Sequence, residues 1–305
     1  MCGYKFEGQE AQLRQFDRYC AENDIGIEGL TTAAMARYND RNPYESIDTR
    51  HSRLLLLRQF ADYMNRTGSP VDNPPDPGES VKRPKYEPYI YSTEELRRLF
   101  TRIDTWPESP RTNNKRRIID PLLFRMLYGC GLRVSEALHL TVSDVDPDEG
   151  VLRIRNAKNG KDRLVPMADS VAARCRAYSE TVHAHSAPDT VYFPGTNGKP
   201  YDLSSVYCRF RQYLWEAGIS HSGRGPRVHD LRHAFCVHRL RKWVLGGHDL
   251  TNLLPYLSAY LGHVDFRGTE HYLRLTVDLY PEIVSRLERA HGYIIPEKGD
   301  IHEES

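Results

Sequence analysis

Residues 69–88 read SPVDNPPDPGESVKRPKYEP, and this stretch divides the chain into two parts. Its six prolines fix φ and remove backbone donors, so neither a helix nor a central strand is expected here. We interpret it as an extended linker between two domains. The linker separates residues 1–68 from residues 89–291, and a polar, acidic tail of residues 292–305 ends the chain.

The part before the linker is predicted to be helical. Apolar residues recur at helical spacing over 9–23 and over 47–66, and another helix is expected to begin near Glu28. Three or four short helices make a small bundle. Because this part carries no catalytic constellation, we interpret it as a binding or positioning module.

The part after the linker is also expected to be mostly helical. Ser92 or Thr93 is a suitable N-cap, because two glutamates follow in the first turn. A buried helix is predicted over 120–138, with an interruption near Gly129–Gly131, and the pattern is helical again from about 204 to 291.

One hairpin breaks this helical pattern. Val151–Arg155 and Arg163–Val165 read as short strands, and the segment between them, Asn156–Gly160, has turn chemistry. The predicted fold class is therefore mainly α with a small β-sheet, or α+β.

Composition narrows the class of protein. The 305 residues include 42 basic and 41 acidic side chains, but residues 101–291 hold 27 basic and 21 acidic ones, which permits a nucleic-acid-binding face. No apolar run approaches the ~20 residues of a membrane helix, and no secretory signal is visible. The six cysteines form no Cys-x-x-Cys pair, so reduced thiols in a cytoplasmic protein are expected.

Four short segments carry side chains suited to one chemistry. They are GLRVSEAL at 131–138, AKNGKDRLVP at 157–166, VHDLRH at 228–233, and LGH at 261–263, which Tyr272 follows nine residues later. Arginine forks match phosphate oxygens, histidine exchanges protons near pH 7, and lysine can donate a proton. Tyrosine is a nucleophile that needs help, because less than about one part in a thousand is phenolate at pH 7. If these groups converge, they suit attack of a tyrosine on a phosphodiester.

In this order and with these gaps, the four segments resemble the tyrosine recombinase (phage integrase) family. The resemblance covers roughly residues 90–290. It implies a helical core-binding, SAM-like domain at 1–68 and a catalytic domain at 89–291. It also implies a site-specific DNA recombinase or integrase, and the sequence around Tyr272 favours one from a mobile element.

The resemblance assigns a role to each motif residue. Tyr272 corresponds to the nucleophile and Lys158 to the general acid of the hairpin, while Glu136 corresponds to the acid that supports the site. The residues that correspond to the phosphate-binding set are Arg133, His229, Arg232 and His263.

The family chemistry implies a 3′-phosphotyrosyl intermediate that conserves the bond energy. Neither a metal nor ATP nor another cofactor is then expected. The implied partners are double-stranded DNA recombination sites, other copies of the chain in a homotetramer, and an accessory recombinase or directionality protein. A cytoplasmic, nucleoid-associated location follows.

The residues themselves leave alternatives open. Lys161 competes with Lys158 as the general acid. His229 and His233 are spaced to share one helix face, as metal ligands do, although we interpret His233 as a structural residue. Other tyrosines near the motif that could replace Tyr272 are Tyr256, Tyr260 and Tyr280.

Three other functions share parts of this pattern. They are a DNA-binding relative with an inactive site, a type IB topoisomerase, and a metal-dependent phosphodiesterase. A protein–DNA adduct that forms in chelator would exclude the phosphodiesterase, and relaxation of DNA without a specific site would favour the topoisomerase.

Overall fold

The structure is a computed structural model, and it divides into two compact units, Met1–Lys85 and Tyr86–Ser305. Each unit is described by itself. The residues that the structure describes are 7–40, 42, 44–78, 87–107, 115–155, 162–195, 198–222, 225–262 and 272.

The first unit is a small helical bundle. Its elements are α1 (Glu7–Glu22), the short 3₁₀ helix η1 (Ile27–Gly29), α2 (Thr32–Asp40) and α3 (Ile47–Arg66). The bounds of α3 agree with the predicted 47–66, and Ser46 caps it by accepting a hydrogen bond from the Thr49 N–H. The expectation of a helix beginning near Glu28 was wrong, because only a 3₁₀ turn forms there and α2 begins at Thr32.

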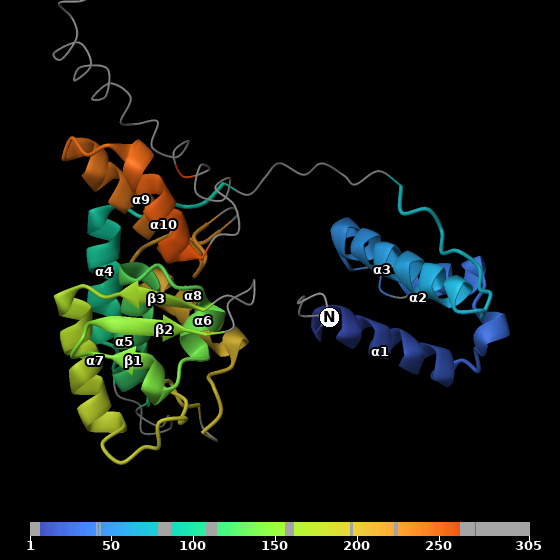
Figure 1. Ribbon diagram of the computed structural model, residues 1–305, viewed down its shortest axis with the longest axis horizontal. Coiled ribbons are helices and arrows are strands. Elements are labelled where there is room, and N and C mark those ends of the chain that lie inside the picture. Colours follow the sequence, from blue (N-terminus) through green and yellow to red (C-terminus); the bar gives the residue numbers. More distant parts are fainter. Residues whose placement is uncertain are drawn as a thin grey trace, which may run out of the picture. The chain divides into compact units, whose positions relative to one another are not determined.

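The second unit is built around one buried helix. Its helices are α4 (Thr93–Asp104), α5 (Lys115–Gly129), α6 (Val134–Leu138), α7 (Asp169–Val182), α8 (Leu203–Glu216), α9 (Asp230–Leu245) and α10 (Leu250–Leu261). The central helix α5 packs against α4, α6, α7 and α9. Figure 1 shows α9 and α10 together at one end of this unit.

A three-stranded antiparallel sheet covers part of the helical core. Its strands are β1 (Val145–Asp146), β2 (Val151–Ile154) and β3 (Arg163–Pro166), in the order β1-β2-β3. The predicted hairpin of β2 and β3 is confirmed, with Ile154 opposite Arg163 at the end next to the turn. Neither β1 nor α7 was expected from the sequence. The fold class, mainly α with a small sheet, is confirmed.

The predicted interruption of the helix over 120–138 is also confirmed. The helix α5 begins earlier than predicted, at Lys115, and stops at Gly129. Gly131 then adopts a φ of +59°, and a Cβ at this position would lie 2.7 Å from the ring of Phe235. Only glycine fits this turn without strain, and the turn places Arg133 at the start of α6.

No helix in the described ranges is both long and apolar enough to span a bilayer.

The capping hydrogen bonds at the N-terminus of α4 can be tested by substitution. Ser92 Oγ accepts a hydrogen bond from the Glu95 N–H at 3.1 Å, and Glu95 accepts one from the Ser92 N–H at 2.8 Å. We expect Ser92→Ala to lower the free energy of unfolding by about 1 kcal/mol. Urea unfolding measures this, with Ser170→Ala in the first turn of α7 as control. An equal effect of both substitutions would contradict the capping role.

Candidate active site

Arg133 and Glu136 form the first part of the site, at the start of α6. The Arg133 backbone N–H donates to Glu136 Oε2 at 2.9 Å, and its Nη1 donates to Oε1 at 2.6 Å. The short helix therefore fixes both side chains, and the carboxylate is 5% exposed.

Arg232 joins this pair from α9. It is 1% exposed, and its guanidinium donates to the Gly131 carbonyl and to the Leu261 carbonyl, each at 2.7 Å. Its Nη1 lies 3.8 Å from Glu136 Oε2. Arg232 therefore ties α9 to the turn before α6 and to the end of α10.

Glu136 stands among more arginines than one carboxylate can neutralise. Arg163 on β3 donates to both of its oxygens, at 3.0 and 2.9 Å. Burial pushes the pKa of Glu136 up, but the hydrogen bonds and charges of Arg163 and Arg133 hold it at about 2. The cluster of Arg133, Arg163, Arg232 and Glu136 thus carries two excess positive charges. Such a partly buried cluster favours an anion.

His229 lies directly before α9 and faces the same arginines. Burial, followed by the charges of Arg232 and Arg133, lowers its pKa to about 4. The imidazole is therefore neutral at pH 7. It can donate a hydrogen bond without adding to the positive charge of the site.

Tyr272 brings a hydroxyl into this neighbourhood. It is 3% exposed and packs among apolar residues of α9 and α10, which include Phe235, Leu257 and Leu261. Its hydroxyl also interacts with Arg232 and Cys236. Burial raises the pKa of Tyr272, while Arg232 acts to lower it.

His233 lies beside Tyr272, a contact that the sequence did not indicate. Its Nδ1 lies 3.0 Å from the hydroxyl oxygen of Tyr272. Its ring also meets that of His229 edge to face, with centroids 4.8 Å apart. The helical spacing of the two histidines was visible in the sequence, but the contact of His233 with Tyr272 was not.

The structure therefore gathers most of the predicted residues around one point. Arg133, Glu136, His229, Arg232 and Tyr272 are linked by the contacts above. Lys158, its competitor Lys161 and His263 lie outside the described residues. Within the described ranges, no group of three or more His, Cys, Asp or Glu side chains could hold a metal ion.

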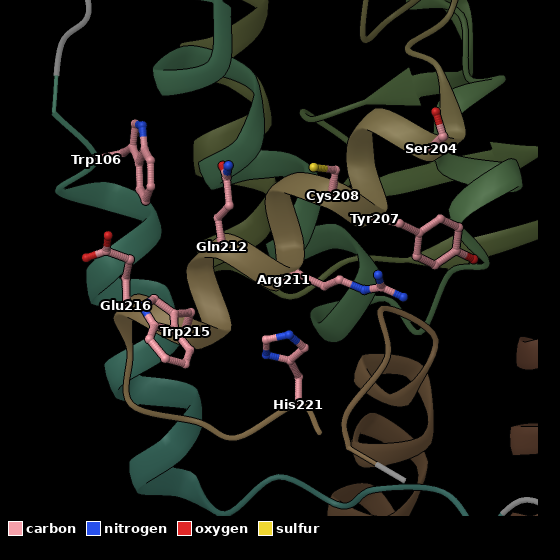
Figure 2. A pocket seen from close by; sticks show the side chains of 9 residues that line it. All are labelled: Trp106, Ser204, Tyr207, Cys208, Arg211, Gln212, Trp215, Glu216 and His221. Carbon is pink, nitrogen blue, oxygen red and sulfur yellow. The ribbon is translucent and has the colours of Figure 1, made fainter. Parts of the chain in front are cut away.

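A second feature is an open hollow of about 860 Å³ along α8. It shares no residue with the cluster around Glu136. Figure 2 shows Tyr207 and Arg211 extending from α8, with Trp215 farther along the helix and His221 beyond its end. Arg211 and Trp215 are exposed. The hollow therefore offers a cation and aromatic surface on one face of the unit.

Known proteins resemble this chain over most of its length. Residues 91–278 match the model of the phage integrase family. The provisionally assigned integrase/recombinase y4rB of Sinorhizobium fredii is 33% identical, over 94% of this chain and 92% of its own length. Tyrosine recombinase XerD of Proteus mirabilis is 30% identical, over 75% of this chain and 69% of its own.

Solved structures show the same fold. The XerH recombinase bound to its difH substrate aligns with a TM-score of 0.60 at 19% identity, over 86% of this chain and 74% of that one. A lambda integrase dimer on a core site aligns with a TM-score of 0.58 at 15% identity, over 87% and 70%.

The chain belongs to the phage integrase family, as the motifs predicted. It is a tyrosine-type site-specific recombinase.

The lowered pKa of His229 predicts a pH dependence of stability. An unfolded histidine titrates near 6.5, so between pH 6.5 and about 4 the unfolded chain binds more protons than the folded one. Stability due to His229 is therefore present above pH 6.5 and is lost as the pH falls toward 4. We expect His229 to cost the wild type about 2 kcal/mol in free energy of unfolding between pH 7 and pH 4.5, and we expect His229→Gln to lack this loss.

Urea unfolding at pH 7 and pH 4.5 measures the difference. The matched control is His185→Gln, because His185 is an exposed histidine of the same unit. A wild-type slope that persists in His229→Gln would show that His229 is not held neutral by the fold.

Proposed function

We propose that this recombinase cuts and rejoins double-stranded DNA through a covalent 3′-phosphotyrosyl intermediate. The observation that carries the proposal is the position of the Tyr272 hydroxyl beside Arg232, in a cluster with two excess positive charges. A phosphodiester carries one negative charge and gains a second as a nucleophile adds, so such a cluster stabilises the transition state more than the ground state.

In the proposed reaction, Tyr272 Oη gives its proton to His233 Nδ1, which lies 3.0 Å away, and bonds to the scissile phosphorus while the bond from phosphorus to the 5′ oxygen breaks. Arg133 and Arg232 bind the non-bridging oxygens, and neutral His229 donates a hydrogen bond to one of them. Glu136 holds the arginines in place. By their positions in the motifs, Lys158 protonates the leaving 5′ oxygen and His263 joins the phosphate-binding set.

The second half of the reaction reverses the first with a new strand. The 5′ hydroxyl of a partner strand attacks the phosphotyrosyl bond and releases Tyr272. The energy of the bond is conserved in the intermediate, so neither ATP nor a metal ion enters these steps.

The proposed partners follow from this chemistry and from the relatives. The XerH structure contains its difH substrate, and the lambda integrase structure contains a core site. We infer that this chain acts on two duplex sites as a homotetramer, with residues 1–68 as its core-binding domain, and that accessory proteins set the direction. DNA that flanks the gene is the first substrate to examine.

The nucleophile is tested by covalent trapping. Nicked duplexes from the flanking DNA are incubated with protein in excess EDTA, and adducts are separated on denaturing gels. We expect a protein–DNA adduct with the wild type and none with Tyr272→Phe, because the phenol oxygen is the atom that bonds to phosphorus. The matched control is Tyr256→Phe, since Tyr256 is a 73% exposed tyrosine on α10.

Three other results of the trapping assay would contradict the proposal. An adduct that survives Tyr272→Phe would assign the nucleophile to another residue. An adduct that EDTA abolishes would require a metal, and tight DNA binding with no adduct would indicate a DNA-binding protein without this activity.

The hollow along α8 is the proposed place of one DNA contact. Arginine binds phosphate, and exposed aromatic rings stack on sugars and bases. We expect Arg211→Ala to weaken DNA binding and to reduce the slope of log affinity against log salt by about one. The rate of adduct formation at saturating protein should stay near that of the wild type.

Fluorescence anisotropy at several salt concentrations measures this slope. Arg176→Ala serves as control, because Arg176 is an exposed arginine of α7 that is paired with Asp148. Equal losses of DNA affinity in the two variants would contradict a DNA contact at Arg211 of α8.

A further inference from the structure

Arg163 is a buried arginine that none of the predicted roles includes. It is the first residue of β3, and its side chain is 10% exposed. Besides its two hydrogen bonds to Glu136, its Nε donates to the Tyr260 carbonyl at 2.8 Å. One guanidinium therefore joins the hairpin, α6 and α10.

The same guanidinium packs on the backbone of Gly262. A Cβ at Gly262 would lie 3.0 Å from Arg163 Nη1 and 3.2 Å from its Cδ, and Gly262 has a φ of +65°. Glycine is therefore the residue that both the turn and Arg163 allow here. This contact lies one residue before His263 in the sequence.

Three arginines share the C-terminal end of α10. Successive carbonyls accept from different residues: Tyr260 from Arg163 at 2.8 Å, Leu261 from Arg232 at 2.7 Å and Gly262 from Arg133 at 3.4 Å. The last carbonyls of a helix lack partners within the helix and carry partial negative charge, so cations stabilise them. Arg163 thus belongs to the same cap as the two arginines proposed to bind phosphate.

Arg163 also determines which arginines form hydrogen bonds with Glu136. It donates to both carboxylate oxygens, while Arg232 remains 3.8 Å away. Without Arg163 the buried carboxylate would be left short of partners, and a buried charge in that state draws the nearest cation toward it. Arg133 already donates to the carboxylate, so that cation is Arg232, whose Nη1 would then face the carboxylate in place of a phosphate.

We propose that Arg163 is a positioning residue for DNA cleavage. By holding Glu136 and the end of α10 together, it keeps Arg133 and Arg232 directed at the scissile phosphate. This inference rests on the proposed function, because it concerns the phosphate-binding arginines of the same reaction.

The test compares Arg163→Gln and Arg163→Lys with the same changes at Arg153. Arg153 is an exposed arginine of the neighbouring strand β2. Single-turnover adduct formation on nicked duplex, at saturating protein, gives the cleavage rate, and anisotropy gives the DNA affinity. We expect both Arg163 variants to cleave about 100-fold more slowly, with DNA affinity changed by less than about threefold. Lysine cannot rescue, because it lacks the planar fork. The Arg153 variants should match the wild type.

Two further measurements separate positioning from general damage. If Arg163 acts through Glu136, the double variant Arg163→Gln/Glu136→Gln should be no slower than the slower single variant. A substrate with sulfur at the bridging 5′ position has a leaving group that needs no proton. We expect this substrate to rescue Lys158→Ala and not Arg163→Gln, because the defect lies in the phosphate-binding arginines.

The outcomes are distinct. A wild type that forms no adduct overturns the proposed function and this inference with it. The inference alone fails if the wild type cleaves and the Arg163 variants cleave equally well. It also fails if the double variant cleaves more slowly than either single variant, by the product of the two losses in rate. It fails as well if the sulfur substrate restores the cleavage rate of Arg163→Gln. The lysine variant keeps the test valid should Arg163→Gln not fold, and thermal melting of each variant identifies that case.

Discussion

The buried carboxylate of Glu136 organises the second unit. It accepts hydrogen bonds from Arg133 and Arg163 and lies near Arg232, so it gathers cations from α6, β3 and α9 around one point. Arginines brought this close would repel one another in the absence of an anion. One acid among three arginines offsets part of that repulsion and leaves a positive surplus for a second anion. The surplus is the physical basis of the proposed phosphate-binding role.

The same arginines also fix the end of α10. Their donors satisfy the carbonyls of Tyr260, Leu261 and Gly262, so the helix ends at the cluster. Tyr272 packs against α9 and α10, and its hydroxyl meets His233. The proposed phosphate site and the proposed nucleophile are therefore built on shared elements. A substitution in one is expected to shift the geometry of the other, because the contacts between them are buried and closely packed.

Local patterns predicted a large part of this arrangement. The apolar stripe over 47–66 gave α3, and the glycines at 129 and 131 marked the break before α6. The motif spacing singled out Arg133, His229, Arg232 and Tyr272, and these residues are linked in the structure. The helix expected near Glu28 failed because three residues there form only a 3₁₀ turn. The strand β1 was missed because two residues carry too little periodicity to be recognised.

The sequence by itself determined the family, the fold class and most of the residues that meet at the site, because these depend on residue types at fixed spacings along the chain. Only the tertiary structure decided which side chains share a charge and which carbonyls an arginine caps. Arg163 follows the turn of the hairpin and His233 follows Arg232, and neither position along the chain reveals a partner. Their partners are Glu136, Tyr260 and Tyr272, which lie 27 or more residues away in sequence. Such contacts arise when buried polar groups must find partners across a packed core, and no local pattern records that requirement.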